Sequence, residues 1–230
     1  MRSGWASFGT VLDRPTLRSL VVETNDGIIA TAGVVEGFVG AGATGTALVV
    51  AALCTLIAGG VALGGTRYAE EAAERDARLA VIAEEQAQLQ RSPAEELAEL
   101  AALYEARGLS PDLARQVASE LSARDALAAH IEAEHHLSVQ EIRWAPVIIA
   151  VGAGIAYALG STIPLLAVLL APDDLRAQAT FVATVVSLAA TSIFLSRVGV
   201  TRVANTLARN VLVGLAAMGL GLLAGWLLRP

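Results

Sequence analysis

The sequence is short of the residues on which several protein classes depend. Its 230 residues contain one cysteine, Cys54, which excludes an internal disulfide framework and a cysteine-rich metal cluster. It has no phosphate-binding P-loop, so ATP is not expected to drive its activity. No nucleophile and base stand in a recognisable catalytic motif, so we expect neither an enzyme nor a covalently bound cofactor. We also expect no nucleic-acid partner.

Apolar residues, by contrast, are abundant. They make up 55% of the chain, and the mean hydropathy is +0.59, which is too high for an ordinary soluble domain. The apolar runs lack the period-two alternation of barrel strands, so a helix bundle is predicted. Runs of about 20 residues cross a bilayer. Five such spans are predicted, at about 20–41, 46–65, 147–171, 178–196 and 210–228.

The charge is concentrated between the second and third spans. This segment holds all three histidines and 16 of the 22 carboxylates. The sequence therefore predicts an all-α integral membrane protein with an inserted acidic helical domain. Its expected parts are an N-terminal segment (1–19), spans one and two (20–65), the acidic domain (66–143) and spans three to five (144–230).

The arginines predict the orientation. With five spans, 14 of the 16 arginines lie on one side of the membrane, and only Arg176 and Arg229 lie on the other. Because positive residues favour the cytoplasmic side, the N-terminus and the acidic domain are expected in the cytoplasm. The N-terminus shows no clear cleavage site, so the first span is expected to act as its own insertion signal.

Cap and turn residues predict the helices of the acidic domain. No breaker stands between residues 67 and 90, so the second span is expected to continue as a helix beyond the membrane. Ser92, Pro93 and Glu95 are typical of a capping box with proline at the first helical position. A stripe of apolar residues follows and Gly108 ends the helix; the stripe is Leu97, Leu100 and Tyr104.

Two further helices are expected in the same domain. Ser110 and Pro111 open one of them, and the other is predicted from about Arg124 to His136.

Carboxylates inside the first span are the main candidates for transport chemistry. Asp26 and its neighbour Asn25 are expected on the transport path. A carboxylate near the bilayer centre costs about 3 kcal/mol. A cation or proton path would offset that cost, and Gly27 would allow an ion or a neighbouring helix to approach. A hydrated position capped by Arg14 or Arg18 is the alternative. Glu36 lies about 15 Å further along the helix, as an exit ligand, a proton carrier or a solvated interfacial residue.

The acidic domain has pairs of residues with metal-ligand spacing. Glu70 and Glu74 are one turn apart, as are Glu95 and Glu99, and such pairs repel unless a cation bridges them. His130 and Glu134 have i, i+4 spacing, and Glu132 and His135 have the i, i+3 spacing of carboxylate-bridged iron bundles. Mixed carboxylate and imidazole ligands suit Fe²⁺, Mn²⁺ or Zn²⁺. A solvated acidic face is the alternative for each pair.

Other features of the spans admit structural and functional interpretations. Pro164 in the third span indicates either a broken helix lining a cavity or a tolerated kink. Gly221 and Gly225 have the small-xxx-small spacing of close helix contacts, which makes the last span a packing surface. Cys54 is either a soft metal ligand or, more commonly for a free cysteine, a small buried hydrophobe.

The order of these features resembles the vacuolar iron transporter family, over nearly the whole chain from Arg18 onward. The resemblance rests on four pieces: Asn25-Asp26-Gly27-Ile28-Ile29, Ala102-Leu103-Tyr104-x-x-Arg107-Gly108-Leu109-Ser110, Gly160-Ser161-Thr162-Ile163-Pro164-Leu165, and the glycine-rich fifth span. It implies a homodimer that moves Fe²⁺, and sometimes Mn²⁺, out of the cytosol in exchange for protons, with the pore between the subunits.

The resemblance also implies roles for particular residues. Asp26 would be the membrane site for metal and protons, and glutamates of the acidic domain would collect the metal. The candidates are Glu70, Glu74, Glu84, Glu85, Glu95, Glu99 and Glu134, to which the spacing adds His130. The host would be the cell membrane in a prokaryote or a vacuolar-type membrane in a eukaryote.

The chain departs from the family pattern in its second span. There the family typically places a methionine and, four residues later, a glutamate, where this chain has Val61 and Gly65. The path could use Glu36 or Cys54 instead, the protein could favour another metal, or its transport could be impaired. Two other classes therefore stay open: a membrane-anchored protein that stores or senses iron without transporting it, and a structural module whose acidic helices dock a basic partner.

Overall fold

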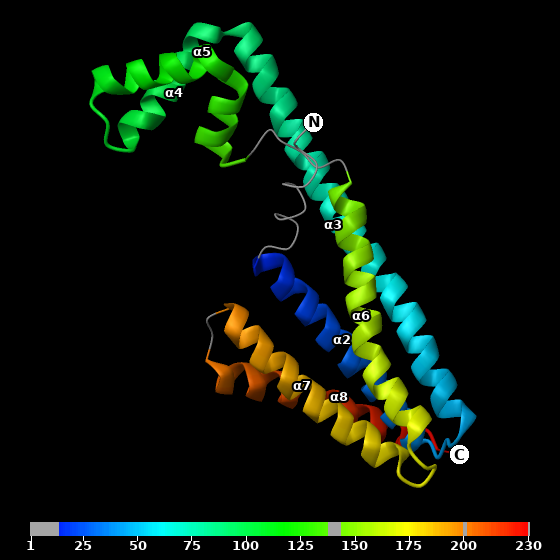
Figure 1. Cartoon of the computed structure of the whole chain (residues 1–230). Coiled ribbons are helices and arrows are strands. Elements are labelled where there is room, and N and C mark those ends of the chain that lie inside the picture. The colour runs from blue at the N-terminus through cyan, green and yellow to red at the C-terminus, as the bar shows by residue number, and fades with distance from the viewer. Residues whose placement is uncertain (1–13, 138–143, 200–201, 230) are drawn as a thin grey trace, which may run out of the picture. The chain divides into compact units, whose positions relative to one another are not determined.

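The computed structural model describes residues 14–137, 144–199 and 202–229. Over these ranges the chain forms seven α-helices and no strand, which confirms the all-helical prediction (Figure 1). The helices are α2 (Arg14–Gly40), α3 (Thr46–Arg91), α4 (Pro93–Ala106), α5 (Pro111–His135), α6 (Ala145–Leu170), α7 (Arg176–Gly199) and α8 (Val203–Leu227). Most of the expected N-terminal segment, 1–13, lies outside the described residues, as do Glu141 and Arg143.

The chain divides into two compact units. Residues up to Tyr68 and from Val147 onward form the first, here called the apolar unit, and Ala69–Pro146 form the second, here called the acidic unit. Helix α3 contributes to both, because it runs without a break over 46 residues. The expected continuation of the second span as a helix is therefore confirmed.

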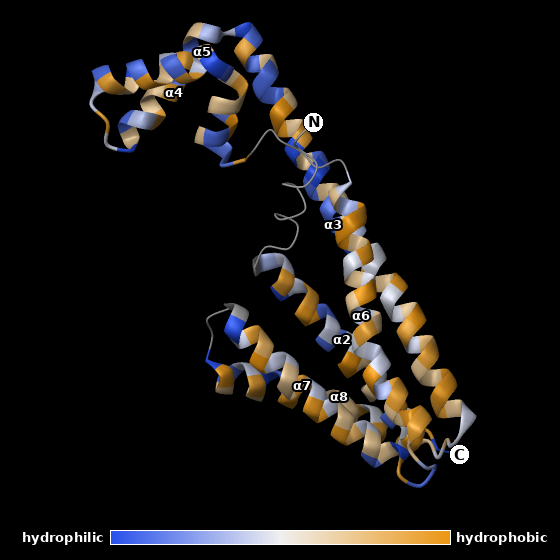
Figure 2. Cartoon of the chain, viewed as in Figure 1, coloured by the Kyte–Doolittle hydropathy of each residue, from blue (hydrophilic) through white to orange (hydrophobic). Residues whose placement is uncertain are grey.

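The apolar and polar residues separate between these units. Figure 2 shows hydrophobic residues along α6, α7, α8 and the first part of α3, and hydrophilic residues on the rest of α3 and on α4 and α5. Among the described helices, α3, α6, α7 and α8 are long and apolar enough to cross a membrane. Helix α2 is not among these four; it carries Glu23, Asp26 and Glu36. The count of five spans stays a prediction.

Glycines bring α2 and α8 into close contact. A Cβ atom on Gly225 would lie 1.8 Å from the carbonyl oxygen of Gly37, and one on Gly221 would lie 2.2 Å from that of Gly33. No real Cβ approaches backbone so closely, so only glycine fits at these two positions. The prediction that the last span is a packing surface is confirmed, and its partner is the first helix.

A second close crossing joins α2 to α6 beside Asp26. A Cβ on Gly27 would lie 2.1 Å from the carbonyl oxygen of Tyr157, and one on Gly160 would lie 1.9 Å from that of Thr24. Ser161 Oγ donates a hydrogen bond to the carbonyl oxygen of Gly27 at 3.1 Å. Gly27 therefore accommodates a neighbouring helix. Helix α6 continues through the buried Pro164 without a break.

Polar side chains connect α7 to its neighbours. The hydroxyl of Thr191 donates to the side-chain oxygen of Asn25 on α2, and Asn210 on α8 donates to the hydroxyl of Ser192 at 3.0 Å. These hydrogen bonds satisfy buried polar groups and define the register between the helices. Asn25, one of the expected path residues, thus has a packing role.

In the acidic unit, α4 packs on α5 around a small core of Leu100, Ala101, Ala118 and Ala133. The expected apolar stripe is wrong in one position, because Leu97 is exposed. The side chain of Ser92 makes no capping hydrogen bond, so the predicted capping box is not formed, although Pro93 does begin the helix. Gly108 ends α4 as expected, with a φ of +100°.

Helix α5 is interrupted at Asp125, whose backbone is extended (φ −163°, ψ 95°). Asp125 Oδ1 accepts a hydrogen bond from the amide of Ala128 at 3.0 Å, as an N-cap residue does for a new helix. The helix predicted from about Arg124 to His136 is therefore the second half of α5. His136 closes it in the left-handed conformation, with a φ of 54°.

Candidate metal site

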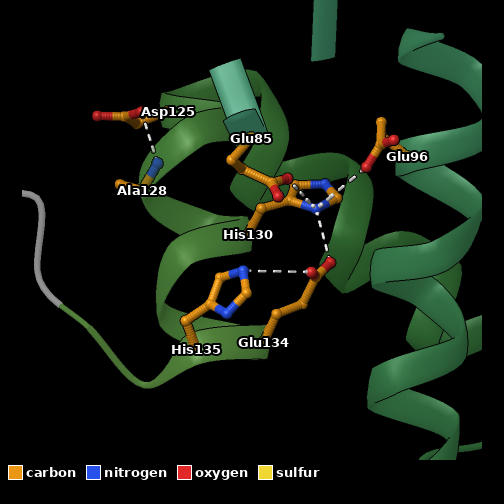
Figure 3. A network of polar contacts seen from close by, with 7 residues as sticks. All are labelled: Glu85, Glu96, Asp125, Ala128, His130, Glu134 and His135. Atoms are coloured by element: carbon orange, nitrogen blue, oxygen red, sulfur yellow. Dashed lines mark hydrogen bonds and ion pairs between the residues drawn. The ribbon is translucent and has the colours of Figure 1, made fainter. Parts of the chain in front are cut away.

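Four side chains of the acidic unit converge on one point. Glu85 comes from α3, Glu96 from α4, and His130 and Glu134 from α5 (Figure 3). One ligand atom from each lies within 4.8 Å of all the others. Three helices therefore meet at a single cluster, here called the Glu85 cluster.

The imidazole of His130 is at the centre of the Glu85 cluster. Its Nδ1 lies 3.1 Å from Glu85 Oε1, 3.2 Å from Glu134 Oε1 and 3.8 Å from Glu96 Oε2. His130 is fully buried, Glu85 is 2% exposed, and Glu134 is half-buried. Glu85 Oε1 has no partner with hydrogen-bond geometry among the described residues. A buried carboxylate oxygen in that position is available to a cation.

The electrostatics of Glu85 also favour a cation at this cluster. Burial raises the pKa of Glu85, and the neighbouring carboxylate of Glu134 raises it further, while His130 opposes the shift. Three clustered carboxylates around one imidazole repel each other when all are ionised. A divalent cation reduces this repulsion and uses all four ligands.

The donor set and the spacing fit a first-row divalent metal. Opposite ligands around such an ion lie about 4 Å apart, twice a bond length of about 2.1 Å. Ligand atoms that already lie within 4.8 Å of one another need only a small inward shift. Three carboxylates and one imidazole favour Fe²⁺, Mn²⁺ or Zn²⁺ over Ca²⁺.

The structure brings together three of the expected metal residues and leaves the others apart. Glu85, His130 and Glu134 are in the cluster, whereas five of the others are exposed; these are Glu70, Glu74, Glu84, Glu95 and Glu99. Glu74 instead pairs with Arg78 at 3.0 Å. Glu132 is exposed and outside the cluster, and His135 only reaches Glu134, at 3.8 Å.

Glu96 is the cluster residue that the sequence interpretation missed. A signal for it exists, because Glu96, Leu100 and Tyr104 are spaced i, i+4 and i+8, which places them along one side of a helix. Leu100 is fully buried and Glu96 is 9% exposed. The expected pair of Glu95 and Glu99 points to solvent.

The carboxylates of α2 lie in different surroundings. Asp26 is exposed at the surface of the apolar unit, although its neighbour Asn25 is buried. Glu36 is buried, and its Oε1 has no hydrogen-bond partner among the described residues. Glu23, which the sequence interpretation did not single out, is buried and paired with Arg67. The exposed Cys54 is not the buried hydrophobe that free cysteines usually are.

One known protein family matches most of the chain. The sequence profile of the VIT family matches residues 17–226. The chain belongs to the VIT family. The match extends from α2 to α8, which confirms the resemblance seen in the sequence.

Three relatives are vacuolar iron transporters by name. The chain is 35% identical to one from Acanthamoeba castellanii over 114 residues, which are 50% of this chain and 41% of that protein. It is 31% identical to one from Plasmodium falciparum over 93 residues, 40% of this chain and 34% of that protein. It is 26% identical to vacuolar iron transporter 2 of rice, Oryza sativa subsp. japonica, over 179 residues, which are 77% of this chain and 72% of that protein. The chain thus spans less than half of the first two relatives.

Val61 and Gly65 line an apolar groove between α3 and α6 of this VIT-family chain. Gly60, Gly64 and Gly154 also line this groove, as do apolar side chains of α6. Val61 is 72% exposed. A methionine and a glutamate at positions 61 and 65 would project from this same surface, but here the surface has no metal ligand at these two positions.

The raised pKa of Glu85 predicts how pH affects the cluster. The folded protein without metal holds this proton more tightly than the unfolded chain. Its stability therefore falls as pH rises from the ordinary glutamate range through the raised pKa. Metal binding needs the carboxylate, so affinity for Mn²⁺ is expected to fall as pH is lowered through the same window.

Mn²⁺ titrations of the full chain across a mildly acidic pH series would measure this dependence. An Asp26→Asn background restricts the signal to the acidic unit. Glu85→Gln is expected to flatten the pH dependence, and Glu84→Gln, at the exposed neighbouring position, is expected to leave it unchanged. If Mn²⁺ affinity depended on pH equally in the two variants, Glu85 would not be the ligand whose protonation controls binding.

Proposed function

We propose that this VIT-family protein moves Fe²⁺, or Mn²⁺ or another divalent metal, out of the cytosol in exchange for protons. The observation that carries the proposal is the buried Glu85 cluster, one ligand of which stands on the same unbroken helix that enters the apolar unit. In this proposal the acidic unit lies in the cytoplasm and captures the metal. The metal is the cargo, and protons move in the opposite direction.

The membrane part of the proposal has five spans, with α2 as the first. Helix α2 packs against α7 and α8, and it crosses α6 at Gly27, so it belongs within the apolar unit. An odd number of spans also keeps most arginines on one side. The N-terminus is then cytoplasmic.

Asp26 is the proposed exchange site in the membrane. It is exposed at the surface of a unit whose other exposed residues are mostly apolar, and a carboxylate facing lipid is costly. A polar path formed with a second copy of the chain would remove that cost. We therefore propose a homodimer in which Asp26, with the neighbouring Asn25, faces the path between subunits, and Glu36 takes part further along α2.

The test is metal uptake into liposomes that contain the purified protein, under an imposed pH gradient. The intact chain is expected to take up Fe²⁺ only when the gradient is present. Asp26→Ala is expected to reduce uptake to that of protein-free liposomes, because it removes the exposed carboxylate of the proposed exchange site. Asp173→Asn, which neutralises an exposed acid outside the predicted spans, is the control and should transport normally.

The alternative is a membrane-anchored protein that stores or senses iron. The observation in its favour is the apolar groove at Val61 and Gly65, which has no metal ligand at the positions where the family pattern places them. This alternative predicts no uptake by the intact chain together with metal binding at the Glu85 cluster. Uptake that depends on both the gradient and Asp26 would exclude it.

A further inference from the structure

A partly buried ion pair lies one helical turn from Asp26. Glu23 on α2 is 2% exposed, and its Oε1 accepts hydrogen bonds from Arg67 Nε on α3 at 2.9 Å and from Ser19 Oγ at 3.1 Å. Its second oxygen, Oε2, is buried without a hydrogen-bond partner among the described residues. Half of this buried carboxylate is therefore still available to a cation.

Glu23 and Asp26 are electrostatically coupled. Residues spaced i, i+3 lie on the same side of a helix, and the charges of both Glu23 and Arg67 act on Asp26. Two carboxylates thus share this neighbourhood with the guanidinium of Arg67. The site already accommodates a positive charge, which is supplied by the protein itself.

Arg67 is suited to be a movable counter-ion. Arginine does not lose its proton in proteins, so it can leave Glu23 only by rotating away. Its side chain is 34% exposed, whereas that of Glu23 is 2% exposed, so the arginine has access to solvent and the carboxylate does not. Arg67 also lies close to the point where α3 passes from the apolar unit into the acidic unit.

We propose that Glu23 is a second metal ligand beside Asp26, and that Arg67 is a tethered cation which an incoming divalent metal displaces from Glu23. The pair of carboxylates binds the metal, and the arginine returns when the metal leaves. The inference rests on the proposed function only for the identity of the ion. Metal binding tests it without any transport.

A purely structural role makes different predictions. If the pair only holds α2 against α3, removing either partner should destabilise the protein and leave metal affinity unchanged. If Arg67 competes with the metal, the two substitutions act in opposite directions. Neutralising the arginine strengthens binding, and neutralising the glutamate weakens it.

The experiment measures Mn²⁺ binding to the purified full chain in detergent. Glu85→Gln and Glu134→Gln are first combined, to remove the Glu85 cluster from the signal. In that background Arg67→Gln is expected to raise Mn²⁺ affinity about tenfold, and Glu23→Gln to lower it by about the same factor. Arg78→Gln breaks an exposed ion pair on the same helix and should change nothing.

Thermal unfolding of each variant separates lost folding from lost binding. Should Arg67→Gln fail to fold, Arg67→Lys keeps the charge without the forked hydrogen-bond geometry, and it is expected to raise affinity by a smaller factor. Unchanged affinity in a folded arginine variant overturns the inference. So does an absence of Mn²⁺ binding in the background protein, or residual binding that survives Asp26→Asn. A protein with the expected binding pattern but no uptake would overturn only the transport proposal.

Discussion

Glu85→Gln is expected to lower the affinity of the acidic unit for Mn²⁺ by about 100-fold or more. Even hydrogen-bond partners outside the ligand shell are worth about 10–100-fold in metal affinity, and Glu85 is in direct reach of the other ligands. Calorimetric titration of the full chain, in an Asp26→Asn background, measures the dissociation constant for Mn²⁺. Glu84→Gln carries the same charge change at an exposed position and should bind normally.

The same substitution is expected to have the opposite effect on the metal-free protein. Removing one of three clustered carboxylates relieves repulsion, so the metal-free protein with Glu85→Gln should unfold at a higher temperature than the unmodified chain. With saturating Mn²⁺ the order should reverse, since only the unmodified chain binds the metal tightly. A variant that is less stable in both conditions would show that Glu85 has a packing role and not a ligand role.

Gly225→Ala is expected to destabilise the apolar unit by about 3 kcal/mol or more. The new methyl group would be placed 1.8 Å from the carbonyl oxygen of Gly37, and backbone atoms cannot move aside as the end of a side chain can. α2 must then separate from α8, and the Asp26 site on α2 would move with it. Unfolding of the full chain in detergent by a denaturing surfactant would measure the loss.

Helix α8 contains its own control for this experiment. Gly219 is on the same helix, and a Cβ there meets no atom within 4 Å. Gly219→Ala makes the same chemical change and should be neutral or slightly stabilising, because alanine favours the helix more than glycine does. If both variants lost stability equally, helix propensity and not the contact with Gly37 would be the cause.

The helices were predictable from the sequence because their signals are local. Long apolar runs and the lack of breakers after residue 67 indicated the helices, and the spacing of His130 and Glu134 identified half of the cluster. Which of Glu95 and Glu96 joins the Glu85 cluster does not follow from such local signals. It depends on how α4 is rotated against α5, and therefore on whether Leu97 or Ala101 joins Leu100 in the core.

Contacts between residues that are far apart in the sequence could not be predicted from it. Glu23 and Arg67 are separated by 44 positions, and the sequence shows only an acid in an apolar run and an arginine after another run. The contact of Gly225 with Gly37 could not be predicted either, because small-residue spacing on α8 indicates a packing face but not the partner helix.

The Glu85 cluster is expected to make the acidic unit's resistance to proteases dependent on metal. Its ligands come from three helices, so a bound ion cross-links segments that are otherwise held by a small core of leucine and alanine residues. An ion at 100 times its dissociation constant stabilises the form that binds it by about 2.7 kcal/mol. In a metal-poor cell, α4 and α5 would open more often and be cleaved sooner. The lifetime of the protein would then follow the supply of the metal that the cluster binds.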